Sequence, residues 1–119
     1  MKAIQINSTK RTITAIEVSG LESMQAVVGG DIEVATEIKH NDKWNTFYCN
    51  EEGLSLNVRD WFIVQDAHQP FKGNGLIVGF DPDSGESIDT NLTVEDVKKV
   101  VKFADDNTIS LYMTMGMGK

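Results

Sequence analysis

Residues 31–50 read DIEVATEIKHNDKWNTFYCN, and this stretch decides the class of fold. In residues 31–39, isoleucine and valine alternate with charged side chains, which is typical of a half-buried strand. The turn-forming residues 41–43 follow, and a second β-rich run continues from Trp44 to Asn50. The stretch therefore predicts a β-hairpin, and hairpins build antiparallel sheets.

The N-terminal residues predict a second hairpin. Ile4 and Ile6 alternate with polar neighbours, and residues 12–18 form another β-rich run after a polar turn. Ile13 and Ile16 fall on opposite faces of that second strand. We therefore expect either a bulge in the strand or burial of both of its faces.

Two segments carry helix signals. Ser19 and Glu22 have the spacing of a capping box, and a glycine pair follows Val28 where that helix should end. Thr93 is the expected cap of a longer helix that runs to Ala104. The apolar stripes consist of Leu21, Met24, Val27 and Val28 in the first helix and of Val94, Val97, Val100, Val101 and Ala104 in the second. We expect both stripes to face one shared interior.

The remaining segments are shorter. Residues 61–64 are compatible with a buried strand or with one helical turn, and residues 66–75 predict a loop. Residues 76–80 and 109–114 predict two further strands. The fold class expected from this order is α+β, with a mainly antiparallel sheet and two helices packed on one face.

Length and composition are those of a globular domain. The 119 residues predict a single domain over 1–119, with 115–119 as a frayed C-terminal tail. Hydrophobic residues make up 40% and charged residues 24% of the chain, which is ordinary globular usage. The single cysteine, Cys49, cannot form an internal disulfide, in agreement with a reducing compartment.

Net charge and hydropathy limit the partners and the cellular location that we expect. Eighteen acidic against eleven basic residues give a net charge of −7, which repels the nucleic-acid backbone and anionic membranes. Direct nucleic-acid binding is therefore disfavoured. The apolar runs are far shorter than the ~20 residues that cross a bilayer, and the N-terminus lacks a secretory signal pattern. We expect a cytoplasmic protein with no membrane association.

Four motifs resemble those of a known family. They are MKAI at residues 1–4, VGGDIE at 28–33, CNEEGL at 49–54 followed by Asn57, and GLIVG at 75–79. In this order they are similar to a family of small phage-encoded and mobile-element proteins that carry a domain of unknown function. The resemblance implies an accessory protein in the cytoplasm of an infected or element-bearing host cell. It does not indicate any reaction that the protein catalyses.

The sequence departs from the family pattern between Asp60 and Lys72. There the segments WFIV at 61–64 and DAHQ at 66–69 replace a more compact linker. Ligand contacts that the family shares are therefore not transferred to this region.

Five polar residues are the candidate ligand-binding residues. Glu51, Glu52, Asn57 and Arg59 form a cluster on the family-like segment, where the guanidinium could grip a carboxylate or a phosphate. His68 lies in a polar loop and is the better placed of the two histidines. The alternative is structural: Asn57 closes a turn and the glutamates face water.

Other sequence features favour structural roles. Asp81, Asp83, Glu86 and Asp89 crowd oxygens together, but their spacing does not fit a calcium loop of the EF-hand type. Instead we expect a turn whose small side chains bond their own backbone. Cys49 follows the pattern of a small buried hydrophobe. No metal and no cofactor is expected.

The sequence contains no complete catalytic constellation, which favours a non-catalytic accessory protein that binds a host or phage macromolecule. Anti-defence inhibition is one form of such binding, and the expected partner is a host or phage protein. The alternative is a small-molecule ligand, bound by a nucleotide-binding protein or a small hydrolase that uses Arg59, His68 and the glutamates. A third possibility is an oligomeric structural protein whose contact face carries Trp44 and Tyr48. The oligomeric state stays open.

Overall fold

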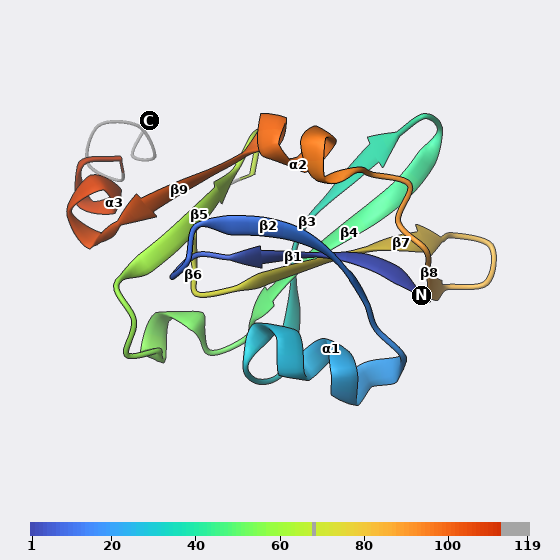
Figure 1. The fold of residues 1–119 in the computed structure, drawn as a ribbon, viewed down its shortest axis with the longest axis horizontal. Helices are drawn as coiled ribbons and strands as arrows, with labels where there is room; N and C mark the ends of the chain where they lie inside the picture. The colour runs from blue at the N-terminus through green and yellow to red at the C-terminus, as the bar shows by residue number, and fades with distance from the viewer. Residues whose placement is uncertain (68, 113–119) are drawn as a thin grey trace.

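The computed structural model describes residues 1–67 and 69–112. In chain order the elements are β1 (Lys2–Asn7), β2 (Thr12–Glu17), α1 (Gly20–Val28), β3 (Ile32–His40), β4 (Lys43–Asn50), the 3-10 helix η1 (Gly53–Ser55), β5 (Asp60–Val64), β6 (Phe71–Lys72), β7 (Gly75–Asp81), β8 (Glu86–Ile88), α2 (Val94–Val100), β9 (Val101–Asp105) and α3 (Asp106–Tyr112) (Figure 1). Among these helices, none is both long and apolar enough to cross a membrane.

The larger sheet contains both predicted hairpins. Its strand order is β2-β1-β7-β4-β3, and β8 pairs with β7. All of its pairings are antiparallel. The central strand β7 joins the two hairpins, because it pairs with β1 on one side and with β4 on the other. β3 therefore lies at one edge of the sheet.

The smaller sheet has the order β6-β5-β9. Residues 61–64, which the sequence left open between strand and helical turn, belong to β5. Phe62 of β5 is fully buried, and its ring centroid lies 5.3 Å from that of Phe71 in β6. Both rings share a core cluster with Phe47 and Ile77 of the larger sheet. The smaller sheet thus covers one face of the larger one.

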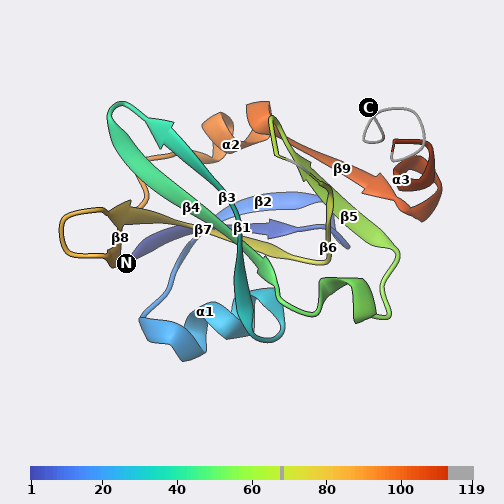
Figure 2. The same ribbon diagram turned by 180° about the vertical axis from the view of Figure 1, so that it is seen from behind.

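The two predicted helices, observed as α1 and α2, lie on opposite faces of the larger sheet (Figures 1 and 2). Successive side chains of β7 point to opposite faces. Leu76 and Val78 join the core cluster under α1, whereas Ile77 joins the cluster that contains Val97 of α2. The α+β class and the antiparallel sheet are confirmed, but the placement of both helices on one face is wrong. Because β7 is apolar on both sides, each face needs its own cover.

Helix α1 buries a narrower stripe than expected. Met24 and Val28 are buried, but the side chain of Leu21 is 57% exposed. The prediction that Leu21 enters the core is therefore wrong. Val97 of α2 is 0% exposed, as predicted. Leu21 lies in the first turn of the helix, one turn before Met24.

The ends of α1 only partly follow the sequence signals. The expected capping box of Ser19 is absent: the Ser19 side chain makes no capping bond, and the hydroxyl of Ser23 accepts from the Ser19 N–H at 2.7 Å instead. Gly29 ends the helix in the left-handed conformation with φ of 83°, as predicted. At α2, Thr93 and Asp96 form a complete capping box.

Two predicted elements near the C-terminus are wrong. The second helix ends at Val100 instead of Ala104, because residues 101–105 pair with β5 as β9. Val101 and Ala104 are still buried, but on a strand. The strand predicted over 109–114 is replaced in the described residues by α3.

Helix α3 has a cap that the sequence analysis overlooked. Asp105 accepts a hydrogen bond from the Thr108 N–H at 2.9 Å, and Ile109 packs against Trp61 and Ala104. The buried Ile109 and a hydrogen bond from the Trp61 indole N–H to Asp106 at 2.7 Å hold this short helix against the smaller sheet. The end of the predicted strand and the tail 115–119 lie outside the described residues.

The bulge lies in β3 rather than in β2. The β1–β2 register is continuous, and Ile13 and Ile16 pack into the clusters on opposite faces of the sheet. Of the two alternatives for that strand, burial of both faces is confirmed. The β3–β4 register shifts between Val34 and Thr36, so this edge strand bends at Ala35.

Candidate functional site

The turn after β4 is fixed by one buried side chain. The amide of Asn50 donates to the Val28 carbonyl at 3.1 Å and accepts from the Glu52 N–H at 2.8 Å. The Glu51 N–H donates to the Asp31 carbonyl at 2.8 Å. A β-carbon on Gly30 would lie 2.9 Å from the Asn50 amide nitrogen, so the glycine lets the amide approach. These bonds leave Glu51 and Glu52 exposed at the end of the hairpin.

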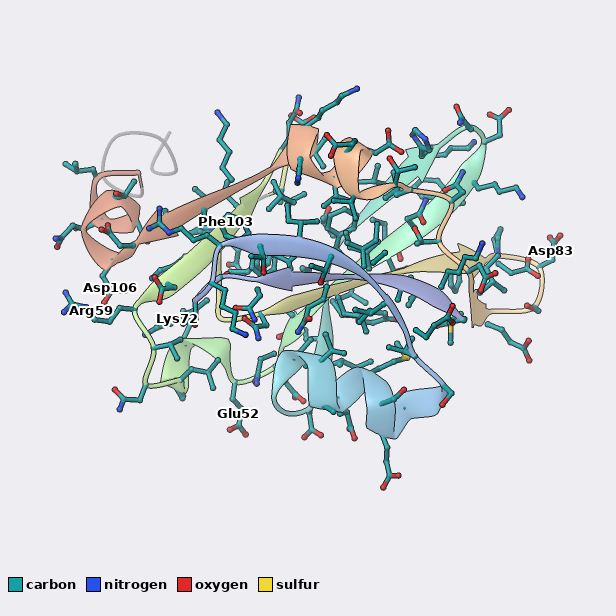
Figure 3. All side chains as sticks on the ribbon, in the orientation of Figure 1. Glu52, Arg59, Lys72, Asp83, Phe103 and Asp106 are labelled. Atoms are coloured by element: carbon teal, nitrogen blue, oxygen red, sulfur yellow. The ribbon has the colours of Figure 1, made fainter. Side chains whose placement is uncertain are left out.

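Next to this turn lies an open pocket of ≈ 280 Å³, here named the acidic hollow. It lies between the end of the β3–β4 hairpin, η1 and the chain around β6. The lining residues are Glu33, Cys49, Asn50, Glu51, Glu52, Gly53, Leu54, Ser55, Gln69, Pro70, Phe71 and Lys72. In Figure 3, the labelled side chain of Glu52 points outward from this region.

Charge and exposure define the character of the acidic hollow. Among its lining residues, three carboxylates of Glu33, Glu51 and Glu52 oppose the one ammonium of Lys72. Lys72 is itself engaged, because its Nζ lies over the Trp61 ring, 5.7 Å from the centroid. Leu54 is 81% exposed at the rim. The hollow therefore offers negative charge beside an uncovered apolar side chain.

The Cys49 thiol does not make the hollow a nucleophilic site. Burial, and then the negative charge of Glu33, raise the pKa of Cys49 to about 11. At neutral pH the group is a protonated thiol, whereas nucleophilic chemistry needs the thiolate. This fits the interpretation of Cys49 as a small buried hydrophobe.

Of the five predicted ligand-binding residues, the structure places two in the acidic hollow. Glu51 and Glu52 both line the acidic hollow. Asn57 is exposed, and neither it nor Arg59 is among the described lining residues. His68 lies outside the described residues.

Arg59 belongs to a different cluster. Its side chain is 79% exposed, and its Nε lies 3.6 Å from a carboxylate oxygen of Asp106. The other oxygen of Asp106 accepts from the Trp61 indole N–H at 2.7 Å. Figure 3 shows Arg59 beside Asp106 and apart from Glu52. The guanidinium and the glutamates therefore do not form one ligand-binding site.

Strand pairing contributes residues that the sequence analysis missed. Glu33 reaches the hollow because β3 pairs with β4 so that Glu33 lies opposite Cys49. Lys72 reaches it through β6, which pairs with β5 opposite Trp61. The alternation of charged and apolar residues in β3 signalled an exposed Glu33, but no sequence signal placed it beside Glu51.

A second pocket lies further along β3. It has a volume of ≈ 360 Å³ and is here named the β3 hollow. Its lining residues are Thr36, Glu37, Ile38, Gln65, Asp66 and Val100. Two carboxylates and no basic side chain are among them. β3 therefore borders one acid-lined pocket near its beginning, at Glu33, and a second one at residues 36–38.

Other residues considered in the sequence have structural roles. The Asp81 carboxylate accepts from the Asp83 N–H at 2.9 Å and from the Ser84 hydroxyl at 3.0 Å, so this turn bonds itself as predicted. In the described part of the chain, no group of histidine, cysteine and carboxylate side chains is arranged to hold a metal ion. Trp44 is partly exposed, with Lys39 Nζ 5.7 Å from its ring centroid, and Tyr48 is half-buried.

Comparison with known proteins gives one match. A family model described as a domain of unknown function (DUF3846) matches residues 1–104, which include every residue of both hollows. No curated protein and no solved structure is similar enough to this chain to count as a match. The match confirms the expectation of a domain of unknown function.

Proposed function

We propose that this chain, which belongs to the family of the domain of unknown function DUF3846, is a non-catalytic protein that binds another protein. The setting is that of a phage or mobile-element accessory protein in the host cytoplasm, and it rests on the sequence resemblance. The partner is a host or phage protein. Inhibition of a host defence protein is one form that this binding takes.

The observation that carries the proposal is the acidic hollow with Leu54 at its rim. Protein interfaces combine a covered apolar centre with a polar rim. Leu54 is 81% exposed, and Glu51 and Glu52, which precede it by three and two residues, line the same pocket. Complete burial of a leucine contributes about 1.5–3 kcal/mol, so a partner that covers Leu54 gains substantially from one contact.

Charge favours a protein partner with a basic surface. The net charge of −7 repels the phosphates of nucleic acids and attracts a basic protein from a distance. The carboxylates around the hollow add local attraction and favour the orientation in which basic side chains meet them.

Affinity capture from host cells or infected cells tests this proposal. The tagged protein is compared with Leu54→Ala and with Glu52→Lys. Glu86→Lys is the matched control, because it changes the charge equally at an exposed position of β8. Cys49 pairs with Gly75 and Glu86 pairs with Asp81, so β7 separates the control from the hollow by about 20 Å at ~3.3 Å per residue.

We expect a protein that the wild type and Glu86→Lys recover and that the two hollow variants lose. If no recovered protein distinguishes the hollow variants from the control, the proposal is wrong. Melting curves with a panel of nucleotides test the small-molecule alternative in parallel. A saturable rise in melting temperature would favour that alternative, because a ligand that binds the folded state stabilises it.

A further inference from the structure

The outer edge of β3 is an unpaired strand edge. β3 comes last in the strand order of the larger sheet and pairs only with β4. In an antiparallel pair, alternate residues direct their N–H and C=O groups away from the partner strand. In the described residues, no backbone hydrogen bond outside the regular ladders uses residues 33–39. β3 is also, with nine residues, the longest described strand.

The side chains along this edge are mainly acidic. The acidic hollow borders β3 at Glu33 and the β3 hollow borders it at residues 36–38, and together their linings contain five carboxylates and one ammonium. The carboxylates belong to Glu33, Glu37, Glu51, Glu52 and Asp66, and the ammonium belongs to Lys72. An extended segment that lies along β3 therefore meets carboxylates beside residues 33 and 36–38, whereas Lys39 adds a positive charge near the C-terminal end of the strand.

The two faces of the edge differ. Glu33 pairs with Cys49 and points to the face that bears the acidic hollow. Val34 pairs with Tyr48, points to the opposite face and is 52% exposed. Beside Glu33 and Val34, a complementary strand therefore carries basic and apolar residues in alternation, because side chains of a strand alternate between faces. Beyond the register shift, Glu37 pairs with Thr46 and points to the same face as Val34.

We propose that β3 takes up an extended basic segment of the partner protein as an added strand. This inference rests on the proposed function and names its binding mode. The backbone of the segment bonds to the outer edge of β3, its lysine or arginine side chains enter the two hollows, and its apolar side chains cover Val34.

A second copy of this chain fits the edge poorly when the two strands pair about Ala35. If two β3 strands paired antiparallel about Ala35, Glu33 of one copy would lie directly opposite Glu37 of the other. Like charges in directly opposed positions destabilise a strand pair. The bulge between Val34 and Thr36 further interrupts a regular self-pairing. Self-pairing in that register is therefore unfavourable, whereas a basic partner complements the five carboxylates of the two hollows.

A synthetic peptide provides the test. A fluorescent peptide of about eight residues with alternating lysine and valine matches a strand of ordinary length. Two further versions carry N-methyl groups on the lysine amides or on the valine amides. Each retains every charge but loses the amide donors along one edge of the peptide. Fluorescence anisotropy measures the affinity of each peptide for the full chain.

We expect the parent peptide to bind and one of the N-methylated versions to bind about tenfold more weakly or worse, with a much smaller change for the other. The parent should also bind Glu33→Lys at least tenfold more weakly, with Glu86→Lys as the control. Equal affinities of all three peptides would overturn the inference, since charge alone would explain the binding. Absence of parent binding also overturns it. If affinity capture still succeeds then, the proposed function survives without this binding mode.

Discussion

Replacement of Asn45 by alanine should strongly destabilise the fold. The Asn45 side chain is 0% exposed, donates to the Asn91 amide oxygen at 2.7 Å and accepts from the Thr90 hydroxyl at 2.6 Å. Asn91 in turn donates to the His40 carbonyl at 2.7 Å. These bonds fasten the segment between β8 and α2 across the larger sheet.

The magnitude follows from the bonds that are lost. Each hydrogen bond contributes about 0.5–1.5 kcal/mol, and a buried group left without its partner costs about 1–3 kcal/mol. Thr90 and Asn91 each keep one other bond, so we expect a total loss of about 2–4 kcal/mol. For a chain of 119 residues, about 4 °C of melting temperature corresponds to 1 kcal/mol, which gives a decrease of about 8–16 °C.

Calorimetry and urea titration measure this loss. Asn107→Ala is the matched control, because the side chain is exposed in α3 and its removal should change stability by less than about 0.5 kcal/mol. If Asn45→Ala melts within about 2 °C of the wild type, the buried amide network does not stabilise the fold as argued.

Four further outcomes are expected. Gly79→Ala should lower stability by about 2 kcal/mol or more in urea titration, because the new β-carbon would lie 2.9 Å from the carbonyl carbon of Asp89. Thr93→Ala should cost about 1 kcal/mol in a thermal melt through loss of the cap. Hydrogen bonds from the Thr93 N–H and then from its side chain lower the pKa of Asp96 below its usual value. The ionised Asp96 carboxylate therefore stabilises the fold at pH values above its unfolded pKa of 3.8, and this contribution is lost as the pH falls through the lower folded pKa. Asp96→Asn should make the free energy of unfolding depend less on pH in the acid range. Cys49, with its pKa raised to about 11, should react slowly with iodoacetamide at about pH 8 in the folded protein and rapidly in urea; rapid labelling of the folded protein would contradict its burial.

The sequence correctly predicted the elements that are determined by residues close together in the chain. The two hairpins follow from alternation and turn residues, and the cap of α2 follows from Thr93 and Asp96. Long-range pairing decided the elements that were predicted wrongly. Valine-rich residues 97–101 fit a helix by spacing, but pairing of Val101 with Val64 in β5 ends the helix one turn early. Val and Ile also favour strands on a pleated surface, so tertiary contacts select between the two conformations.

The same distinction holds for the candidate site. Glu51 and Glu52 were identified because the polar turn itself exposes them. Glu33 and Lys72 reach the acidic hollow only through strand register, which the sequence does not reveal. Arg59 was grouped with the glutamates because it is close in sequence, but the Asp106 carboxylate lies beside it in the structure.

Hydrogen exchange along β3, followed by NMR, tests the central claim most directly. In the free protein, the amides of residues 33–39 that point away from β4 should exchange rapidly, whereas those paired with β4 are protected. On addition of the captured partner or of the alternating lysine–valine peptide, the outward amides should become protected while the exchange of β2 stays unchanged. Continued rapid exchange of these amides in a saturated complex would contradict the proposal that the edge of β3 is the binding surface.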